Sequence, residues 1–204
     1  MSEIKWIFFD IGSTLVDESV AYQKRIEKTV AGTDVGYDDF YNKMVEISEY
    51  HQNSYRKTLE AYGLQTVPWD SGDEIVYPEA EGCLSDLCKR YHVGIIANQD
   101  FGSKERLEKI GLLKYIELVI ASAEEGVAKP DSRIFQIALD RANCNAEEAV
   151  MVGDRLDNDI IPANRIGMTT VWIKQGFGKY AVPSAEDEKP DFTVDNLSEI
   201  KGCL

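Results

Sequence analysis

Short apolar runs alternate with helical patterns along most of this 204-residue chain, and this alternation constrains the fold more than any other feature. Each run is rich in β-branched or aromatic residues and ends in a polar or glycine-containing loop, which is typical of a buried β-strand. The runs lie at residues 4–9, 93–97, 118–121, 150–152 and 170–173, with a weaker one at 192–194. Helical patterns separate them at residues 79–91, 104–110, 133–143 and 158–166. The alternation predicts βαβ units and hence an α/β fold, a Rossmann-like parallel sheet sandwiched by helices.

The alternation is interrupted once, after the first strand, by a long segment that contains no convincing strand. Helical patterns fill this segment, and prolines mark the linker that returns to the sheet. We therefore predict a Rossmann-like core formed by residues 1–15 and 78–204, and an inserted all-helical cap formed by residues 16–77. Because ligands of such sheets bind outside the carboxyl ends of the strands, we expect the cap to be a lid over the first strand's end.

Within the insertion, apolar and aromatic residues recur at helical spacing across residues 40–62. Asp38 and Asp39 can cap the start of this pattern, and Gly63 ends it. The spacing predicts one long helix with His51 on its apolar stripe, so we expect His51 to be a packing residue.

Charge and composition exclude several classes of partner. The chain has 36 Asp and Glu against 22 Lys and Arg, a net charge of −14, and this field repels nucleic acids and anionic lipids. No apolar run approaches the roughly 20 residues of a membrane span, and no signal peptide is recognisable. The 4 cysteines are scattered, which favours free thiols over a zinc site. We expect a cytoplasmic protein without nucleic-acid or membrane partners, of unknown oligomeric state.

Polar side chains follow the predicted strands at positions where they would meet. Asp10 ends the first strand, Asn98 follows the second, Lys129 the third, and Asp154 and Asp159 the fourth. Each residue alone has an ordinary explanation, such as a turn, a surface charge or a helix start. Because the carboxyl ends of parallel strands share one edge of a sheet, we expect all five to converge there.

These motifs resemble those of the haloacid dehalogenase (HAD) superfamily, in the branch with a helical cap between the first two motifs. The segment FFDIGSTLVDE, with Asp10 and Thr14, is similar to the D-x-D-x-T-L motif of that family, and IIANQ to its second motif. GVAKPD resembles the third motif and VMVGDRLDND the fourth, in the family's order. The resemblance extends over nearly the whole chain, but one fold hosts several chemistries.

The resemblance implies an Mg²⁺-dependent phosphatase that acts on a small phosphorylated metabolite. Asp10 would be the nucleophile that forms an aspartyl-phosphate, and Lys129 would pair with it and with the phosphoryl oxygens. Thr14 and Asn98 would contribute to the phosphate site, Thr14 by holding the first loop and Asn98 by hydrogen bonding. The implied Mg²⁺ ligands are Asp10, the backbone carbonyl of Gly12, Asp154 and Asp159.

Gly12 stands where most phosphatases of the family carry an aspartate that protonates the leaving oxygen and later deprotonates the attacking water. Glycine keeps its carbonyl for the metal but supplies no proton, and general acid–base assistance is typically worth about 10² to 10⁴ in rate. On the first interpretation, which we favour, the enzyme prefers esters with good leaving groups. On the second, Asp17 or Glu18 at the start of the cap replaces the acid, although a solvated helix start is the simpler role. On the third, the protein is catalytically silent and binds a phosphorylated ligand or partner.

Two other branches of the family fit these residues less well. Dehalogenases work without Mg²⁺ and carry an aromatic residue at the position of Gly12, and phosphonatase-like members carry alanine there with a cap lysine. The GDxxxxD pattern from Gly153 to Asp159 favours metal and phosphate. Ala97 replaces the Ser or Thr of the second motif, which removes one hydroxyl donor from the phosphate site.

Overall fold

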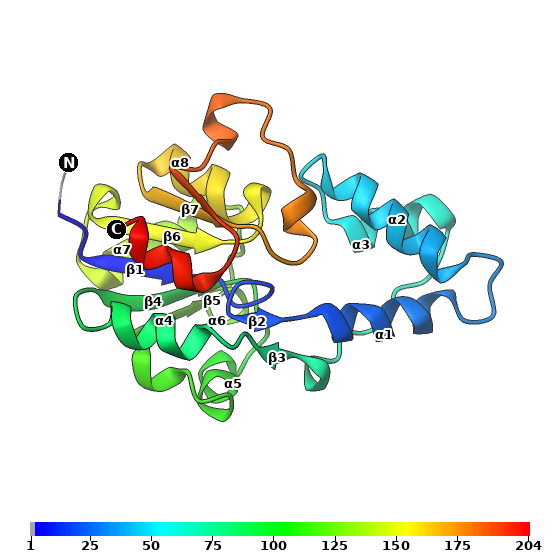
Figure 1. Ribbon diagram of the computed structural model, residues 1–204, viewed down its shortest axis with the longest axis horizontal. Helices are drawn as coiled ribbons and strands as arrows, with labels where there is room; N and C mark the ends of the chain where they lie inside the picture. Colours follow the sequence, from blue (N-terminus) through cyan, green and yellow to red (C-terminus); the bar gives the residue numbers. More distant parts are fainter. Residues whose placement is uncertain (1–2) are drawn as a thin grey trace.

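The computed structural model describes residues 3–204, and its main feature is a six-stranded sheet in the order β5-β4-β1-β6-β7-β8. The strands are β1 (Trp6–Phe9), β4 (His92–Ala97), β5 (Leu118–Ala121), β6 (Ala149–Gly153), β7 (Thr169–Ile173) and β8 (Phe192–Val194). Every neighbouring pair is parallel, and Phe9 of β1 lies opposite Ile95 of β4 and Val152 of β6. The predicted Rossmann-like sheet is therefore confirmed, with β1 at its centre (Figure 1).

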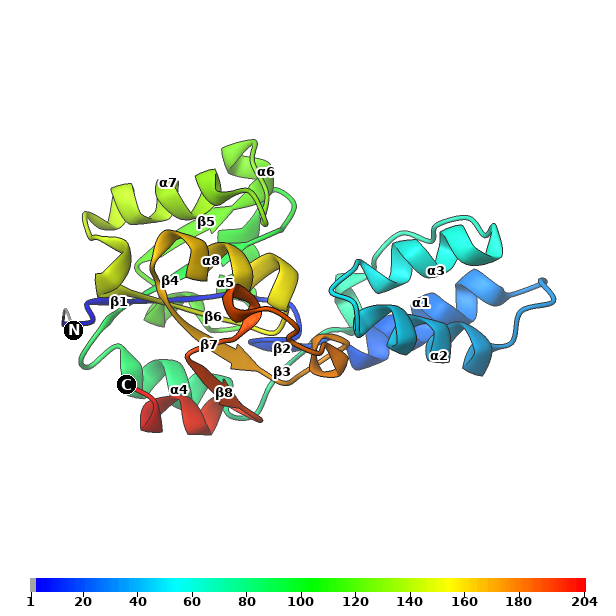
Figure 2. The ribbon, with the colours of Figure 1, turned by 90° about the horizontal axis from the view of Figure 1, so that it is seen from above.

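Helices cover both faces of the sheet because successive side chains of a strand point to opposite faces. In β1, Ile7 and Phe9 belong to one buried apolar cluster and Phe8 to the other. The helices that cover the two faces are α4 (Ala80–Leu87), α5 (Ser103–Lys109), α6 (Ser122–Glu125), α7 (Ser132–Ala142) and α8 (Ile161–Ile166). Figure 2 shows α4 and α7 on opposite sides of the sheet. None of the helices within residues 3–204 is both long enough and apolar enough to cross a membrane.

Three further helices lie beyond the carboxyl ends of the strands (Figure 1). They are α1 (Ser19–Val30), α2 (Tyr37–Ser48) and α3 (Ser54–Tyr62), and they enclose an apolar cluster built on Ile26, Phe40 and Met44. Two short strands, β2 (Val16–Asp17) and β3 (Ile75–Val76), pair antiparallel where the chain leaves the sheet and returns to it. The division into domains at residues 16 and 77 stays a prediction.

The single long helix predicted over residues 40–62 is wrong. A turn separates α2 from α3, and His51 lies in it with φ of 55°. Asn53 starts a new helix because its side-chain oxygen accepts a hydrogen bond from the backbone N–H of Arg56, at 3.0 Å. Gly63 ends α3 in the left-handed conformation, as the pattern predicts. The spacing misleads because α2 and α3 contribute to the same apolar cluster, so their apolar positions read as one stripe.

Candidate active site

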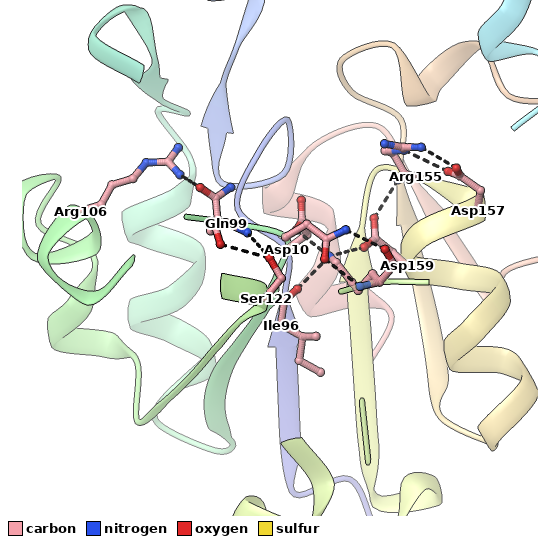
Figure 3. Close-up of polar contacts among 10 residues, drawn as sticks. Asp10, Ile96, Gln99, Arg106, Ser122, Arg155, Asp157 and Asp159 are labelled. Carbon is pink, nitrogen blue, oxygen red and sulfur yellow. Dashed lines mark hydrogen bonds and ion pairs between the residues drawn. The ribbon is translucent and has the colours of Figure 1, made fainter. Parts of the chain in front are cut away.

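The carboxyl ends of β4, β1 and β6 bring the predicted polar residues together. Asp10 directly follows β1, Asn98 follows β4 and Asp154 follows β6. Lys129 enters from the loop after α6, and Asp159 lies in a π-helical turn, Leu156–Ile160, between β6 and α8. Figure 3 shows Asp10 and Asp159 beside each other at this edge. All five residues line one cavity of about 220 Å³.

Lys129 lies at the centre of the site and is almost completely buried. Its Nζ donates hydrogen bonds to Oδ1 of Asp10 at 2.6 Å, Oδ1 of Asp159 at 2.6 Å and the carbonyl oxygen of Ile96 at 2.8 Å. Burial alone would lower the pKa of Lys129, but the carboxylates of Asp10 and Asp159 outweigh it and the pKa is raised. The ammonium therefore stays charged and holds the Asp10 carboxylate by a charge-assisted hydrogen bond.

The three aspartates form a compact acidic cluster. One carboxylate oxygen from each of Asp10, Asp154 and Asp159 lies within 4.8 Å of the others. Burial raises the pKa of Asp154 well above its usual value, and the charges of Asp159 and Asp10 add to this shift. Burial also raises the pKa of Asp159, to about 6, although Lys129 opposes the change. Carboxylates forced together in this way favour a bound cation.

The donor set of the cluster fits Mg²⁺, because it offers hard oxygen ligands and few carboxylates. Both oxygens of Asp159 already accept hydrogen bonds, one from Lys129 Nζ and the other from the backbone N–H of Arg155 at 3.0 Å. Within residues 3–204 the Asp154 carboxylate accepts no hydrogen bond and Asp10 keeps one oxygen without one, so both have oxygens that could bind a cation. Gly12 lines the same cavity.

Asn98 lines the cavity and Thr14 lies buried, and their roles at the phosphate site stay predictions. The side-chain amide of Asn98 donates to the carbonyl of Lys129 and accepts from its backbone N–H, both at 2.8 Å, so its observed contacts hold the Lys129 backbone. Thr14 is fully buried and is not among the described residues that line the cavity. Its hydroxyl has no hydrogen-bond partner within residues 3–204.

Glu18 places a carboxylate against Gly12. A Cβ added to Gly12 would lie 2.5 Å from Oε1 of Glu18, 3.0 Å from its Cδ and 3.1 Å from its Oε2. Ser13 Oγ donates a 2.8 Å hydrogen bond to Oε2 of Glu18. Burial raises the pKa of Glu18 to about 7, with Asp10 adding to the shift and Ser13 opposing it. The expectation of a solvated helix start is therefore wrong for Glu18.

Asp17, the other candidate acid, lies outside this cavity. Its Oδ1 accepts a 2.8 Å hydrogen bond from the backbone N–H of Ser19, and it does not appear among the described residues around Asp10. The structure thus separates two neighbouring carboxylates that the sequence leaves equivalent.

A polar wall from the α2–α3 turn lines the same cavity as the aspartates, and the helical spacing of the sequence does not predict it. The wall consists of His51, Gln52, Asn53 and Ser54. His51 is therefore a cavity residue and not a packing residue on a helix stripe. The run of four polar residues across an apolar spacing is the signal in the sequence that could have revealed this turn.

The loop after β7 connects the sheet with the helices beyond it. Phe177 in this loop lines the cavity, and its ring centroid lies 5.0 Å from that of Tyr22 in α1 and 5.3 Å from that of Tyr41 in α2. Aromatic pairs at these separations are stabilising. Phe177 therefore joins the loop after β7 to α1 and α2.

Comparison with known proteins gives consistent matches over the chain. A family model described as haloacid dehalogenase-like hydrolase matches residues 4–167. The glyceraldehyde 3-phosphate phosphatase of Pyrococcus furiosus is 37% identical, over 100% of this chain and 94% of that protein. The ribulose-1,5-bisphosphate 5-phosphatase of Halopiger xanaduensis is 30% identical, over 88% of this chain and 78% of that protein.

Among solved structures, the HAD hydrolase YfnB of Bacillus subtilis matches with a TM-score of 0.73 and 18% identity. The match covers 100% of this chain and 99% of that one. At this level of identity the likeness shows the fold alone.

Proposed function

Because the chain belongs to the haloacid dehalogenase-like hydrolase family and is a phosphoric monoester hydrolase, we propose that it hydrolyses a small phosphorylated sugar through a phosphoenzyme on Asp10. The family resemblance predicted from the four motifs is confirmed. Two of its relatives are named for glyceraldehyde 3-phosphate and ribulose 1,5-bisphosphate, which supports a sugar phosphate as substrate.

The contact between Lys129 and Asp10 is the observation that carries the proposal. Lys129 donates a hydrogen bond to one carboxylate oxygen of Asp10. The other oxygen makes no hydrogen bond within residues 3–204, and Asp10 lines the cavity. This free oxygen would attack phosphorus, forming the Asp10–phosphorus bond as the bond to the leaving oxygen breaks. Water would then attack phosphorus and release inorganic phosphate and the Asp10 carboxylate. The Lys129 ammonium stabilises the phosphoryl charge in both steps.

Mg²⁺ held by Asp10, the Gly12 carbonyl and Asp154 would supply further positive charge beside the phosphoryl group. Asp159 would position the groups around the metal, because its two oxygens accept hydrogen bonds from Lys129 and from the backbone of Arg155.

The size and polarity of the cavity support a small, hydroxylated substrate. Its volume of about 220 Å³ lies below the range of about 300–1,000 Å³ that is usual for drug-sized ligands. Gln52, Asn53 and Ser54 line the side opposite the aspartates with groups that can donate and accept hydrogen bonds. Sugar hydroxyls complement such a wall.

The test is phosphate release from a panel of phosphorylated sugars in the presence of Mg²⁺, for the wild-type protein and for Asp10→Asn. The wild type should release phosphate, and Asp10→Asn should lose at least about 10³-fold in kcat because the amide is a poor nucleophile. Thermal unfolding of both proteins checks that the variant is folded.

Full turnover by a folded Asp10→Asn protein would contradict the phosphoenzyme. A wild-type protein that binds phosphorylated sugars without releasing phosphate from any of them would instead support the catalytically silent alternative.

A further inference from the structure

The site lacks an acid at position 12, but it does not lack a carboxylate in that place. A side chain built on Gly12 would start 2.5 Å from Oε1 of Glu18 and 3.0 Å from its Cδ. The carboxyl group of an aspartate at position 12 would extend one bond beyond that Cβ. The Glu18 carboxylate thus occupies the space that an aspartate at position 12 would fill.

The local chain path explains how a residue six positions later reaches this space. Ser13 adopts φ of 51°, and the backbone N–H groups of Thr14, Leu15 and Val16 all donate to the carbonyl of Ile11. This tight turn leads into β2 and brings the start of α1 back beside Gly12. Ser13 Oγ then fixes the Glu18 carboxylate with a 2.8 Å hydrogen bond.

Neither helix capping nor the acidic cluster accounts for the position of Glu18. It is the N-cap residue of α1, but its side chain accepts no capping hydrogen bond from that helix. It is also not part of the cluster of Asp10, Asp154 and Asp159 that could hold a metal. Its side-chain hydrogen bond within residues 3–204 is the one from Ser13. Glu18 lines the cavity, and its Oε1 accepts no hydrogen bond within residues 3–204.

Resting on the proposed phosphatase function, we propose that Glu18 is the general acid and base of the reaction, in place of the aspartate that Gly12 lacks. In the first step the protonated Glu18 carboxyl group gives its proton to the leaving oxygen as that oxygen separates from phosphorus. In the second step the Glu18 carboxylate takes a proton from the water that attacks phosphorus, so the acid is regenerated when phosphate and Asp10 are released. With Glu18 in this role, sugar phosphates with ordinary alkyl leaving groups become substrates. The preference for good leaving groups that Gly12 predicts is then no longer expected.

The test compares an alkyl phosphate from the active panel with p-nitrophenyl phosphate, for the wild type and for Glu18→Gln. The nitrophenolate leaving group needs no proton, whereas the alkoxide does. Glu18→Gln should therefore lose about 10² to 10⁴ in kcat/KM for the alkyl phosphate. It should keep kcat/KM for p-nitrophenyl phosphate within a few-fold. It should also show a burst of nitrophenol followed by slow turnover, because the second step has lost its base. Asp17→Asn is the matched control, and it should behave as the wild type on both substrates.

Moving the carboxyl group from position 18 to position 12 gives an independent test even if Glu18→Gln folds poorly. Gly12→Asp alone has no room for its side chain while Glu18 is present. In the double variant Gly12→Asp/Glu18→Ala the space is open, so turnover of the alkyl phosphate should recover at least tenfold relative to Glu18→Ala.

Two outcomes would overturn the role of Glu18 while leaving the phosphatase intact. One is a folded Glu18→Gln protein with wild-type kcat/KM on the alkyl phosphate. The other is an equal loss on both substrates, since that indicates a binding or structural role. A failure of the phosphatase itself is distinguishable, because the wild type would then release no phosphate from either substrate.

Discussion

At the scale of single residues, glycines of the site make room for groups that come from elsewhere in the chain. A Cβ on Gly153 would lie 2.5 Å from Cβ of Asp159, and a Cβ on Gly178 would lie 2.8 Å from the carbonyl carbon of Asp154. Non-bonded carbon atoms prefer separations of about 3.5–4.0 Å, so neither site tolerates a methyl group without displacement. At Gly12 and Gly153 the missing side chain leaves room for a carboxylate, and at Gly178 it leaves room for the backbone of Asp154.

We predict that Gly153→Ala lowers the free energy of unfolding by about 1–3 kcal/mol, because the new methyl group overpacks the buried Asp159. Gly82→Ala is the matched control: Gly82 lies inside α4 with open space around it, so alanine there should raise stability by about 0.5–1 kcal/mol. Urea unfolding followed by circular dichroism measures both changes. A Gly153→Ala protein as stable as the wild type would show that the site accommodates the methyl group.

At the scale of elements, the loop after β7 contacts both the turn at Ser13 and the helices beyond the sheet. Its Gly176 approaches Ser13 so closely that a Cβ there would lie 2.6 Å from the Ser13 Cβ. The next residue, Phe177, contacts Tyr22 on α1 and Tyr41 on α2. One short loop therefore contacts both the turn that positions Glu18 and the helices that close the cavity.

We predict that Phe177→Ala raises KM several-fold and lowers stability, since each aromatic pair that it removes is worth about 0.5–1.5 kcal/mol. Phe101→Ala is the control, because the Phe101 side chain is 80% exposed and should contribute little. Steady-state kinetics and thermal unfolding measure both effects. An unchanged KM in Phe177→Ala would mean that other contacts hold the helices in place.

The elements that local patterns determine could be predicted from the sequence, and those that depend on tertiary contacts could not. The strand before Asp10 and the end of α3 at Gly63 follow from short-range patterns. The spacing does not reveal the break before Asn53, because two helices packed on one cluster produce the same spacing as one long helix. Asn53 itself, a strong N-cap residue inside the pattern, was the local signal against a continuous helix.

The candidate site shows the same division. The sequence brings Asp10, Lys129 and Asp154 to one edge of the sheet because parallel strands end there. It names Glu18 and Asp17 together but cannot choose between them, since the choice depends on the turn at Ser13 and on its hydrogen bond. Which way a side chain points at the start of a helix is decided by the contacts around it and not by its position in the pattern.

At the scale of the whole molecule, the net negative charge of the protein and the local positive charge of the site have opposite effects on an anionic substrate. The net charge of −14 repels an anionic substrate, whereas the buried Lys129 and a bound divalent cation would attract it locally. The raised pKa of Asp154 means that its ionised form is disfavoured in the folded protein without metal. Metal binding and global stability should therefore be coupled.

We predict that Mg²⁺ at about 100 times its Kd stabilises the wild-type protein by about 2.7 kcal/mol, and that Asp154→Asn loses most of this gain. Without Mg²⁺, Asp154→Asn should be more stable than the wild type, because the amide replaces an acid whose ionised form is disfavoured by burial and by the charges of Asp159 and Asp10. Asp34→Asn, an exposed control, should respond to Mg²⁺ like the wild type. Thermal and urea unfolding across a Mg²⁺ titration measure these effects, and an undiminished response of Asp154→Asn would remove Asp154 from the metal site.

The overlap between a side chain at position 12 and the Glu18 carboxylate also bears on how such a site evolves. One substitution at position 12 crowds the site, and one at position 18 empties it, so the acid can move between the two positions only through paired changes. Homologous chains are then expected in two combinations, glycine with glutamate or aspartate with a residue that leaves the space open. A classification based on position 12 alone, without position 18, would wrongly describe the chains with glycine and glutamate as inactive.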